Sequence, residues 1–173
     1  MRLTGERITT LSILGICEWI DGTAFSTSIR ESIWLFPIIE TVHVLGIAAS
    51  AGTILFVDLR LLGIGMKRER FSDVLEQLQP WTLSAFLVML ITGSLLFLSE
   101  ALKCYHSMFF QIKVGMLALA AGNALLFHWK VYPAVEVWDH LPRTPGRARL
   151  AGALSLALWI GIIAMGRAIA YGK

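Results

Sequence analysis

The chain has 173 residues, of which 56% are hydrophobic and 16% charged, and its formal net charge is +3. A soluble protein of this size and composition would have too little polar surface to cover its core, so the composition excludes a soluble domain and indicates a membrane protein. The basic residues do not form an aromatic-interleaved patch of the kind that binds nucleic acid, so we expect no nucleic-acid partner.

The first 32 residues form an arm that precedes the long apolar segments. Its apolar part, residues 8–20, is shorter than the roughly 20 residues that a membrane-spanning helix needs. No convincing small-x-small cleavage site follows, so a signal peptide is not favoured. The sequence instead predicts an amphipathic helix that lies at the membrane interface.

Residues 33–173 contain four apolar windows of spanning length, and the sequence therefore predicts an all-α fold, a four-helix transmembrane bundle behind the interfacial arm. The windows are residues 33–57, 81–99, 108–127 and 150–171.

The loops carry unequal numbers of basic residues. Two connections hold eight Lys and Arg residues, whereas the connection between the second and third spans holds Lys103, with Lys113 just inside the third span. Cytoplasmic loops are enriched in Lys and Arg. We therefore expect a protein of the bacterial inner (cytoplasmic) membrane with both termini periplasmic. The eight residues are Arg60, Lys67, Arg68, Arg70, Lys130, Arg143, Arg147 and Arg149.

The first span contains two ionisable residues, Glu40 and His43. Residues three apart share a helix face, and this face continues with Gly46, Ser50 and Thr53, whose small side chains allow close helix approach. The pair is therefore predicted to face the bundle interior, where ionisable groups are usually functional. The alternative is a Glu–His hydrogen bond that only fixes helix packing.

Other polar or sulfur-containing residues fall at a similar depth near the outer surface. Glu100 ends the second span and His106 lies in the following loop, while one methionine on each remaining helix lies roughly 8 to 16 Å below the outer surface. These side chains are predicted to converge with His43, although methionines often only fill core gaps. The three methionines are Met89, Met116 and Met165.

His128 ends the third span, at the cytoplasmic side, and is either an interfacial side chain or a ligand. Its depth differs from that of His43 by roughly 15 to 20 Å along the bundle axis. One site in each leaflet is therefore favoured over a single haem held by both histidines.

Four further residues are predicted to have structural roles. Asp58 and Arg60, at the cytoplasmic end of the first span, are expected to form an ion pair with each other or with a neighbour. Cys17 and Cys104 both fall on the oxidising side of the membrane, where a disulfide persists. They are either bridged or packed as two unpaired thiols.

Three motifs carry a resemblance: "WLFPIIETVHVLGIAASAGTILFVDLRLLG", then "PWT", then "FQIKVGMLALAAGNALLFH". The chain resembles a family of small proteobacterial polytopic membrane proteins of unknown function with an FPxIExxHVLG…VDLRLLG signature. More loosely, the arrangement resembles b-type cytochromes of the cytochrome b561 kind and CopD-like copper-resistance membrane proteins. The first resemblance implies a fold without an activity.

Three functions follow as hypotheses. The bundle binds haem b, with His43 as one axial ligand and His128 or the methionines as further candidates, and exchanges electrons with a quinone or a periplasmic partner. Alternatively, Glu40, His43, Glu100 and His106 hold a copper, iron or zinc ion. In the third hypothesis the protein is an accessory or scaffold subunit, with a membrane partner or a second copy of itself. All three favour a binding or electron-transfer role over an enzyme.

Overall fold

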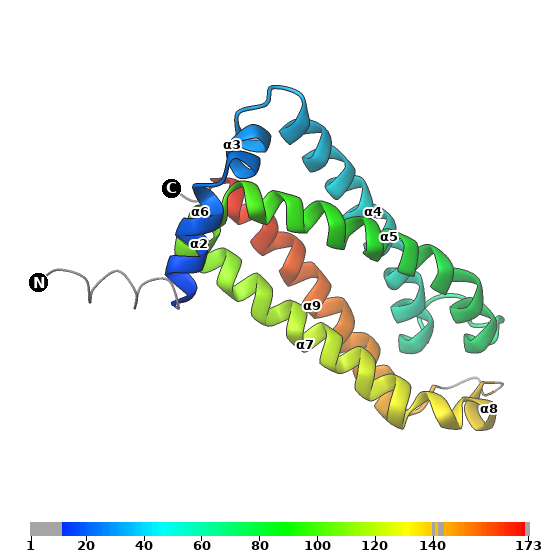
Figure 1. The fold of residues 1–173 in the computed structure, drawn as a ribbon. Helices are drawn as coiled ribbons and strands as arrows, with labels where there is room; N and C mark the ends of the chain where they lie inside the picture. The colour runs from blue at the N-terminus through cyan, green and yellow to red at the C-terminus, as the bar shows by residue number, and fades with distance from the viewer. Residues whose placement is uncertain (1–11, 140, 142–143, 172–173) are drawn as a thin grey trace, which may run out of the picture.

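The computed structural model describes residues 12–139, 141 and 144–171, and this part of the chain is helical, with turns and without strands. The four long helices are α4 (Leu35–Leu62), α5 (Phe71–Ser99), α7 (Met108–Lys130) and α9 (Gly146–Tyr171) (Figure 1). The prediction of an all-α four-helix bundle is confirmed. The short elements are α2 (Ile13–Asp21), α3 (Ala24–Arg30), α6 (Ala101–His106), η1 (Tyr132–Ala134) and α8 (Val135–Trp138).

The long helices have the dimensions of membrane spans. Among the described residues, four helical segments are long and apolar enough to cross a bilayer, with mean hydropathies of 1.5 to 2.0. Large apolar side chains such as Leu90, Leu119 and Ile160 are more than 60% exposed, as lipid-facing residues are expected to be. The protein is therefore a multi-pass membrane protein.

The helices extend beyond the predicted apolar windows. The second apolar window was predicted to start at Trp81, but α5 begins at Phe71 and continues through Pro80. Transmembrane helices tolerate proline because neighbouring groups satisfy the freed backbone positions. The first span is also longer than predicted: α4 ends at Gly63, which adopts a left-handed conformation with φ of 72°.

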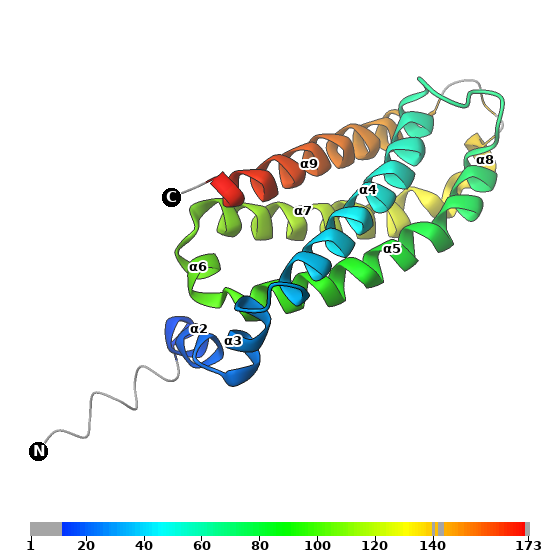
Figure 2. The same cartoon turned by 90° about the horizontal axis from the view of Figure 1, so that it is seen from above.

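The helices are arranged so that α4 lies between α5 and α9, and α9 also packs against α7 (Figure 2). We call the end of the bundle that carries α2, α3, α6 and the C-terminal end of α9 the N-terminal end. The opposite end carries the connection between α4 and α5, together with α8, and we call it the connector end (Figure 1).

An aromatic core closes the connector end. Phe71 is fully buried and packs edge-on against Phe127 and tilted against Trp138, with ring centroids 5.7 and 5.4 Å apart. Asp139 accepts hydrogen bonds from the backbone N–H and the hydroxyl of Ser72, in the first turn of α5. The first N–H groups of a helix have no partner within the helix, so a carboxylate at this position can accept their hydrogen bonds. It also interacts favourably with the helix dipole.

The N-terminal arm contains two short helices in the described part, in place of the single helix predicted over residues 8–20. The side chain of Ser12 caps α2, and the side chain of Thr23 caps α3 after a break at Gly22. Residues 8–11 lie outside the described residues. On α2, Ile13, Ile16 and Trp19 form an exposed apolar stripe, which is typical of a helix that lies on a membrane surface.

Candidate functional site

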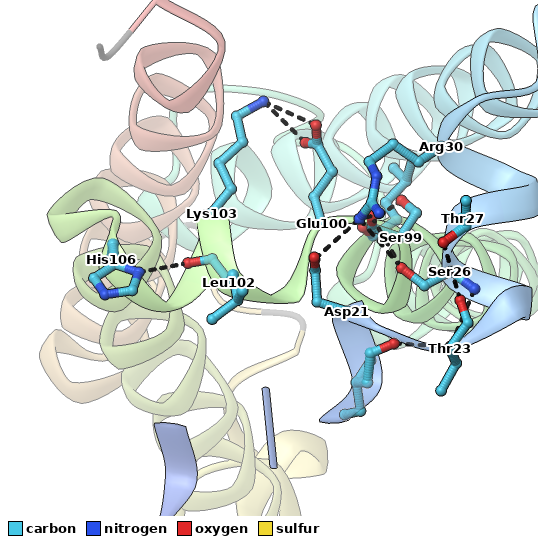
Figure 3. A network of polar contacts seen from close by, with 12 residues as sticks. Asp21, Thr23, Ser26, Thr27, Arg30, Ser99, Glu100, Leu102, Lys103 and His106 are labelled. Atoms are coloured by element: carbon cyan, nitrogen blue, oxygen red, sulfur yellow. Dashed lines mark hydrogen bonds and ion pairs between the residues drawn. The ribbon is translucent and has the colours of Figure 1, made fainter. Parts of the chain in front are cut away.

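A polar network ties the arm to the bundle (Figure 3). The Arg30 guanidinium donates a hydrogen bond to the carbonyl of Ser99, the last residue of α5, over 3.0 Å, and forms an ion pair with Asp21 over 3.1 Å. Ser26, on α3, also donates to the Ser99 carbonyl. Carbonyls at the end of a helix lack intrahelical partners, so this network fixes α3 against α5. Sequence reasoning missed it, because nothing in the sequence links Arg30 to Ser99.

The predicted metal ligands do not come together. Glu100 is paired with Lys103 at 3.0 Å, and His106 Nδ1 lies 2.9 Å from the Leu102 carbonyl (Figure 3). Glu40 is exposed on α4, so the prediction that it faces the interior with His43 is wrong for the free chain. No group of three or more His, Cys, Asp or Glu side chains arranged to hold a metal ion occurs within the described residues.

The small-residue face of α4 packs against α5, as predicted. A Cβ on Gly46 would lie 3.0 Å from Met89 Cγ, and the Ser50 hydroxyl lies 3.0 Å from the Met89 sulfur. Further along the two helices, the Thr82 hydroxyl lies 2.8 Å from the Thr53 hydroxyl. We call this contact line the α4–α5 seam. Its hydroxyls also hydrogen-bond to carbonyls three or four residues earlier in their own helices.

His43 lies on the seam and its ring is oriented by Thr92. His43 Nδ1 is 2.9 Å from Thr92 Oγ1, while the same hydroxyl is 2.7 Å from the Val88 carbonyl. A hydroxyl has one proton, and the carbonyl can only accept, so Thr92 donates to Val88 and accepts from His43. Neutral His43 therefore carries its proton on Nδ1, and Nε2 has a free lone pair.

The ring also packs against α5 and has a cation nearby. A Cβ on Gly93 would lie only 3.1 Å from His43 Cε1. The ammonium of Lys113, on α7, is close enough to interact electrostatically with His43, and it lies 3.6 Å from the Cβ position of Gly166 on α9. His43 on α4 and Lys113 on α7 thus both lie in the N-terminal half of the bundle.

The methionines have packing roles in this structure. Met89 contacts Gly46 and Ser50 on the seam, and Met116 packs directly against Gly161 of α9. Met165 is half-buried on α9. Met89 therefore shares the seam with His43, whereas Met116 belongs to the contact between α7 and α9.

A cavity of about 350 Å³ lies between the four long helices, in the half of the bundle toward the connector end. Its lining is mostly apolar and includes Phe86, Phe127 and Trp159. Ligand pockets of small-molecule sites typically measure about 300 to 1,000 Å³ and combine an apolar lining with a few polar groups. The polar residues of this wall are Asp58, Gln79, Thr82, Asn123, His128 and Ser155.

Asp58 is the carboxylate in the cavity wall. It is only 3% exposed, and Ser155 of α9 hydrogen-bonds to it, but its Oδ2 has no hydrogen-bond partner among the described residues. Arg60 points elsewhere and donates to the Glu69 carbonyl over 2.8 Å. The predicted Asp58–Arg60 ion pair is therefore not formed, because side chains two residues apart on a helix do not face each other.

His128 lies far from His43 along the bundle, as predicted. It lines the cavity on α7 and stacks on Tyr132, with ring centroids 5.2 Å apart and an interplanar angle of 19°. The two histidines therefore belong to different halves of the bundle. His43 lies with Lys113, and His128 lies with Asp58 in the cavity wall.

The cysteines are buried free thiols at the contact between α2 and α6, which matches the unpaired alternative. Burial, followed by the nearby negative charge of Glu100, raises the pKa of the Cys104 thiol to about 11. Cys104 is therefore a protonated and unreactive thiol at neutral pH.

Comparison with known proteins identifies a family of unknown function. Residues 18–172 match the family described as "Family of unknown function (DUF6644)", and the chain belongs to this family. The match covers all four spans and residues 18–32 of the arm. Neither the curated proteins nor the solved structures that were compared gave a match.

Proposed function

We propose that this protein binds haem b through His43 and passes electrons between a membrane quinone and a partner protein. The proposal rests on the free lone pair of His43 Nε2, which follows from the hydrogen bonds of Thr92. An iron-ligating histidine is neutral, and a hydrogen bond from its other ring nitrogen sets its orientation and tautomer. His43 already has the hydrogen-bond partner on its other ring nitrogen.

The surrounding residues fit part of what a haem requires. Haem propionates need cationic partners, and Lys113, in the same half of the bundle as His43, would supply one. The Ser50 hydroxyl lies against the thioether of Met89, and His128 belongs to the other half of the bundle, so among the described residues His43 would hold the iron. A bound haem supplies one-electron redox chemistry, and the chain's own residues orient its ligand and neutralise its charge.

The excess of Lys and Arg in the connections at the connector end supports a location in a bacterial inner membrane with both termini periplasmic. In that orientation His43 lies nearer the periplasmic side and the cavity nearer the cytoplasmic side. The electron partners would then be a quinone within the bilayer and a periplasmic or membrane protein, or a second copy of the chain.

An absorption spectrum of the purified full-length protein tests the haem directly. We expect a Soret band that His43→Ala abolishes or strongly shifts and that His128→Ala leaves largely intact. Thr92→Val should weaken haem binding by about 10- to 100-fold, because it removes the acceptor that orients the imidazole.

A pair of glycine variants provides the matched steric comparison. Gly93→Ala pushes a methyl group against the His43 ring and should shift the band, whereas a Cβ on Gly52, on the same helix as His43, meets no atom within 4 Å. Gly52→Ala should therefore leave the spectrum unchanged. Purified protein without a Soret band and without stoichiometric metal would refute both cofactor hypotheses and favour the accessory-subunit interpretation.

A copper, iron or zinc site is the weaker alternative. Glu100 and His106 have other partners on α6, and Glu40 is exposed, so His43 has no second protein ligand from the predicted set. Elemental analysis of the same preparation distinguishes this alternative from the haem.

A further inference from the structure

The cavity between the four long helices is separate from the His43 site and contains an unsatisfied carboxylate oxygen. We infer that this cavity binds the headgroup of a membrane quinol, with one quinol hydroxyl donating a hydrogen bond to Asp58 Oδ2. The choice of a quinol rests on the proposed electron-transfer function. The binding site itself rests on the cavity and on Asp58.

Asp58 is the feature that requires a ligand. A buried carboxylate oxygen without a partner is destabilising, so such groups in proteins are nearly always hydrogen-bonded. Here Ser155 engages the carboxylate, Arg60 is bonded to the Glu69 carbonyl, and Oδ2 is left without a partner among the described residues. Because Asp58 is 97% buried and lines the cavity, a ligand in the cavity is placed to supply the missing donor.

The lining determines the chemistry of that ligand. Most of the cavity surface is apolar and contains aromatic rings, which suits a ring and a hydrocarbon tail. An acyl chain has no donor for Asp58, and the phosphate diester of a lipid offers only acceptors. A quinol has a hydroxyl on each side of one ring, and Gln79 and His128 offer polar groups on α5 and α7 for the second hydroxyl.

The depth of the site also fits a molecule that is soluble in the bilayer. Asp58 lies four residues before the end of α4, about 6 Å along the helix from its last residue. This places the carboxylate at the connector end of the first span, just beyond the apolar window of residues 33–57. A quinol is dissolved in the bilayer and can therefore reach this end of the bundle from the lipid.

Tryptophan fluorescence of the purified full-length protein tests this inference, because Trp159 lines the cavity. Decylubiquinone quenches nearby tryptophans, and decylubiquinol, kept reduced under argon, competes with it. We expect saturable quenching that Trp159→Phe largely removes, and about tenfold tighter binding of the quinol than of the quinone, because only the quinol donates to a carboxylate.

Three variants decide the outcome. Asp58→Leu should abolish the preference for quinol while leaving weaker binding of both forms, and Ala120→Phe, which fills the cavity, should abolish both. Glu76→Gln changes an exposed carboxylate on α5 that is outside the cavity, and it should leave both affinities unchanged. If Asp58→Leu fails to fold, as judged by gel filtration and circular dichroism, Asp58→Asn replaces it, with loss of the quinol preference expected.

Several results would overturn the inference. These are quenching that does not saturate, quenching that survives both Trp159→Phe and Ala120→Phe, and equal affinity of the wild-type protein for the two forms. The titration measures binding without requiring a haem. If the protein lacks a Soret band but prefers quinol, the haem proposal is rejected and the cavity site is retained. If it shows a Soret band but no quinol preference, only the cavity site is rejected.

Discussion

The two ends of the bundle are stabilised in different ways. At the connector end, Phe71, Phe127 and Trp138 form an aromatic core, and α4 and α9 approach each other closely beside it. At the N-terminal end, the contacts are polar: Arg30 binds the Ser99 carbonyl, and His43 binds Thr92. Each end therefore depends on a different kind of interaction.

This difference explains why the unpaired buried oxygen of Asp58 is tolerated in the half of the bundle toward the connector end. Apolar burial at the connector end offsets the cost of leaving Asp58 Oδ2 without a partner in the adjacent cavity. The N-terminal end has less apolar burial, and its polar side chains are largely engaged. Two residues of the apolar cluster at this end, Leu61 and Phe127, also line the cavity.

Removing the aromatic core should have the largest effect. Phe71→Ala should lower the free energy of unfolding by about 3 to 5 kcal/mol, because it leaves a void where a fully buried ring packs against two others. Denaturant titration of the protein in detergent measures this. Phe56→Ala is the matched control, since Phe56 is 52% exposed on α4, and a loss as large as that of Phe71→Ala would contradict the proposed role of the core.

A smaller effect is expected where α4 meets α9. A Cβ on Gly152 would lie 2.9 Å from Leu61 Cβ and 3.2 Å from the Asp58 carbonyl oxygen. Because backbone atoms are involved, Gly152→Ala should cost about 1 to 3 kcal/mol of stability and separate the helices beside the cavity. On α7, Gly122 has no atom within 4 Å of its Cβ position, so Gly122→Ala should not destabilise the protein. Thermal unfolding of the two variants provides the comparison.

The smallest effect concerns the thiol at the N-terminal end. The pKa of Cys104 is about 11 in the folded protein against an ordinary value of 9.0, so its neutral form is favoured by folding. The resulting stabilisation is present below pH 9 and is lost as the pH rises from 9 to 11. In Cys17→Ser, which leaves one thiol, alkylation of native protein at pH 8 should be much slower than that of denatured protein and should accelerate toward pH 11. Equal rates at pH 8 would contradict a shielded thiol.

Much of the fold could be predicted because membrane spans are long apolar runs. The partner-facing role of Gly46, Ser50 and Thr53 was also predictable, since their spacing places small residues on one face. Glu40 shows the limit of that argument. By its spacing, Glu40 lies on the same side of α4 as His43, but it is exposed because no neighbouring helix covers it. Which residues are covered depends on the distances between the helices, and the spacing within one helix does not specify these distances.

The cavity and its carboxylate were not predictable. Asp58 and Arg60 look like an ion pair in the sequence, yet the helix directs them apart, and the serine that meets Asp58 comes from the last span. A void between four helices depends on the distances between their axes, which the sequence pattern does not specify. The same holds for the Arg30–Ser99 contact, in which the acceptor is a backbone carbonyl.

The back-bonded hydroxyls of the α4–α5 seam have a consequence for biogenesis. Ser50, Thr53, Thr82 and Thr92 each have a carbonyl of their own helix within hydrogen-bond distance, so each hydroxyl has an acceptor available before the helices meet. Each helix can therefore enter the bilayer from the insertion machinery separately, without exposing an unpaired hydroxyl to lipid. Association of the two helices then adds contacts such as the one between Thr82 and Thr53 at a later, independent step of assembly.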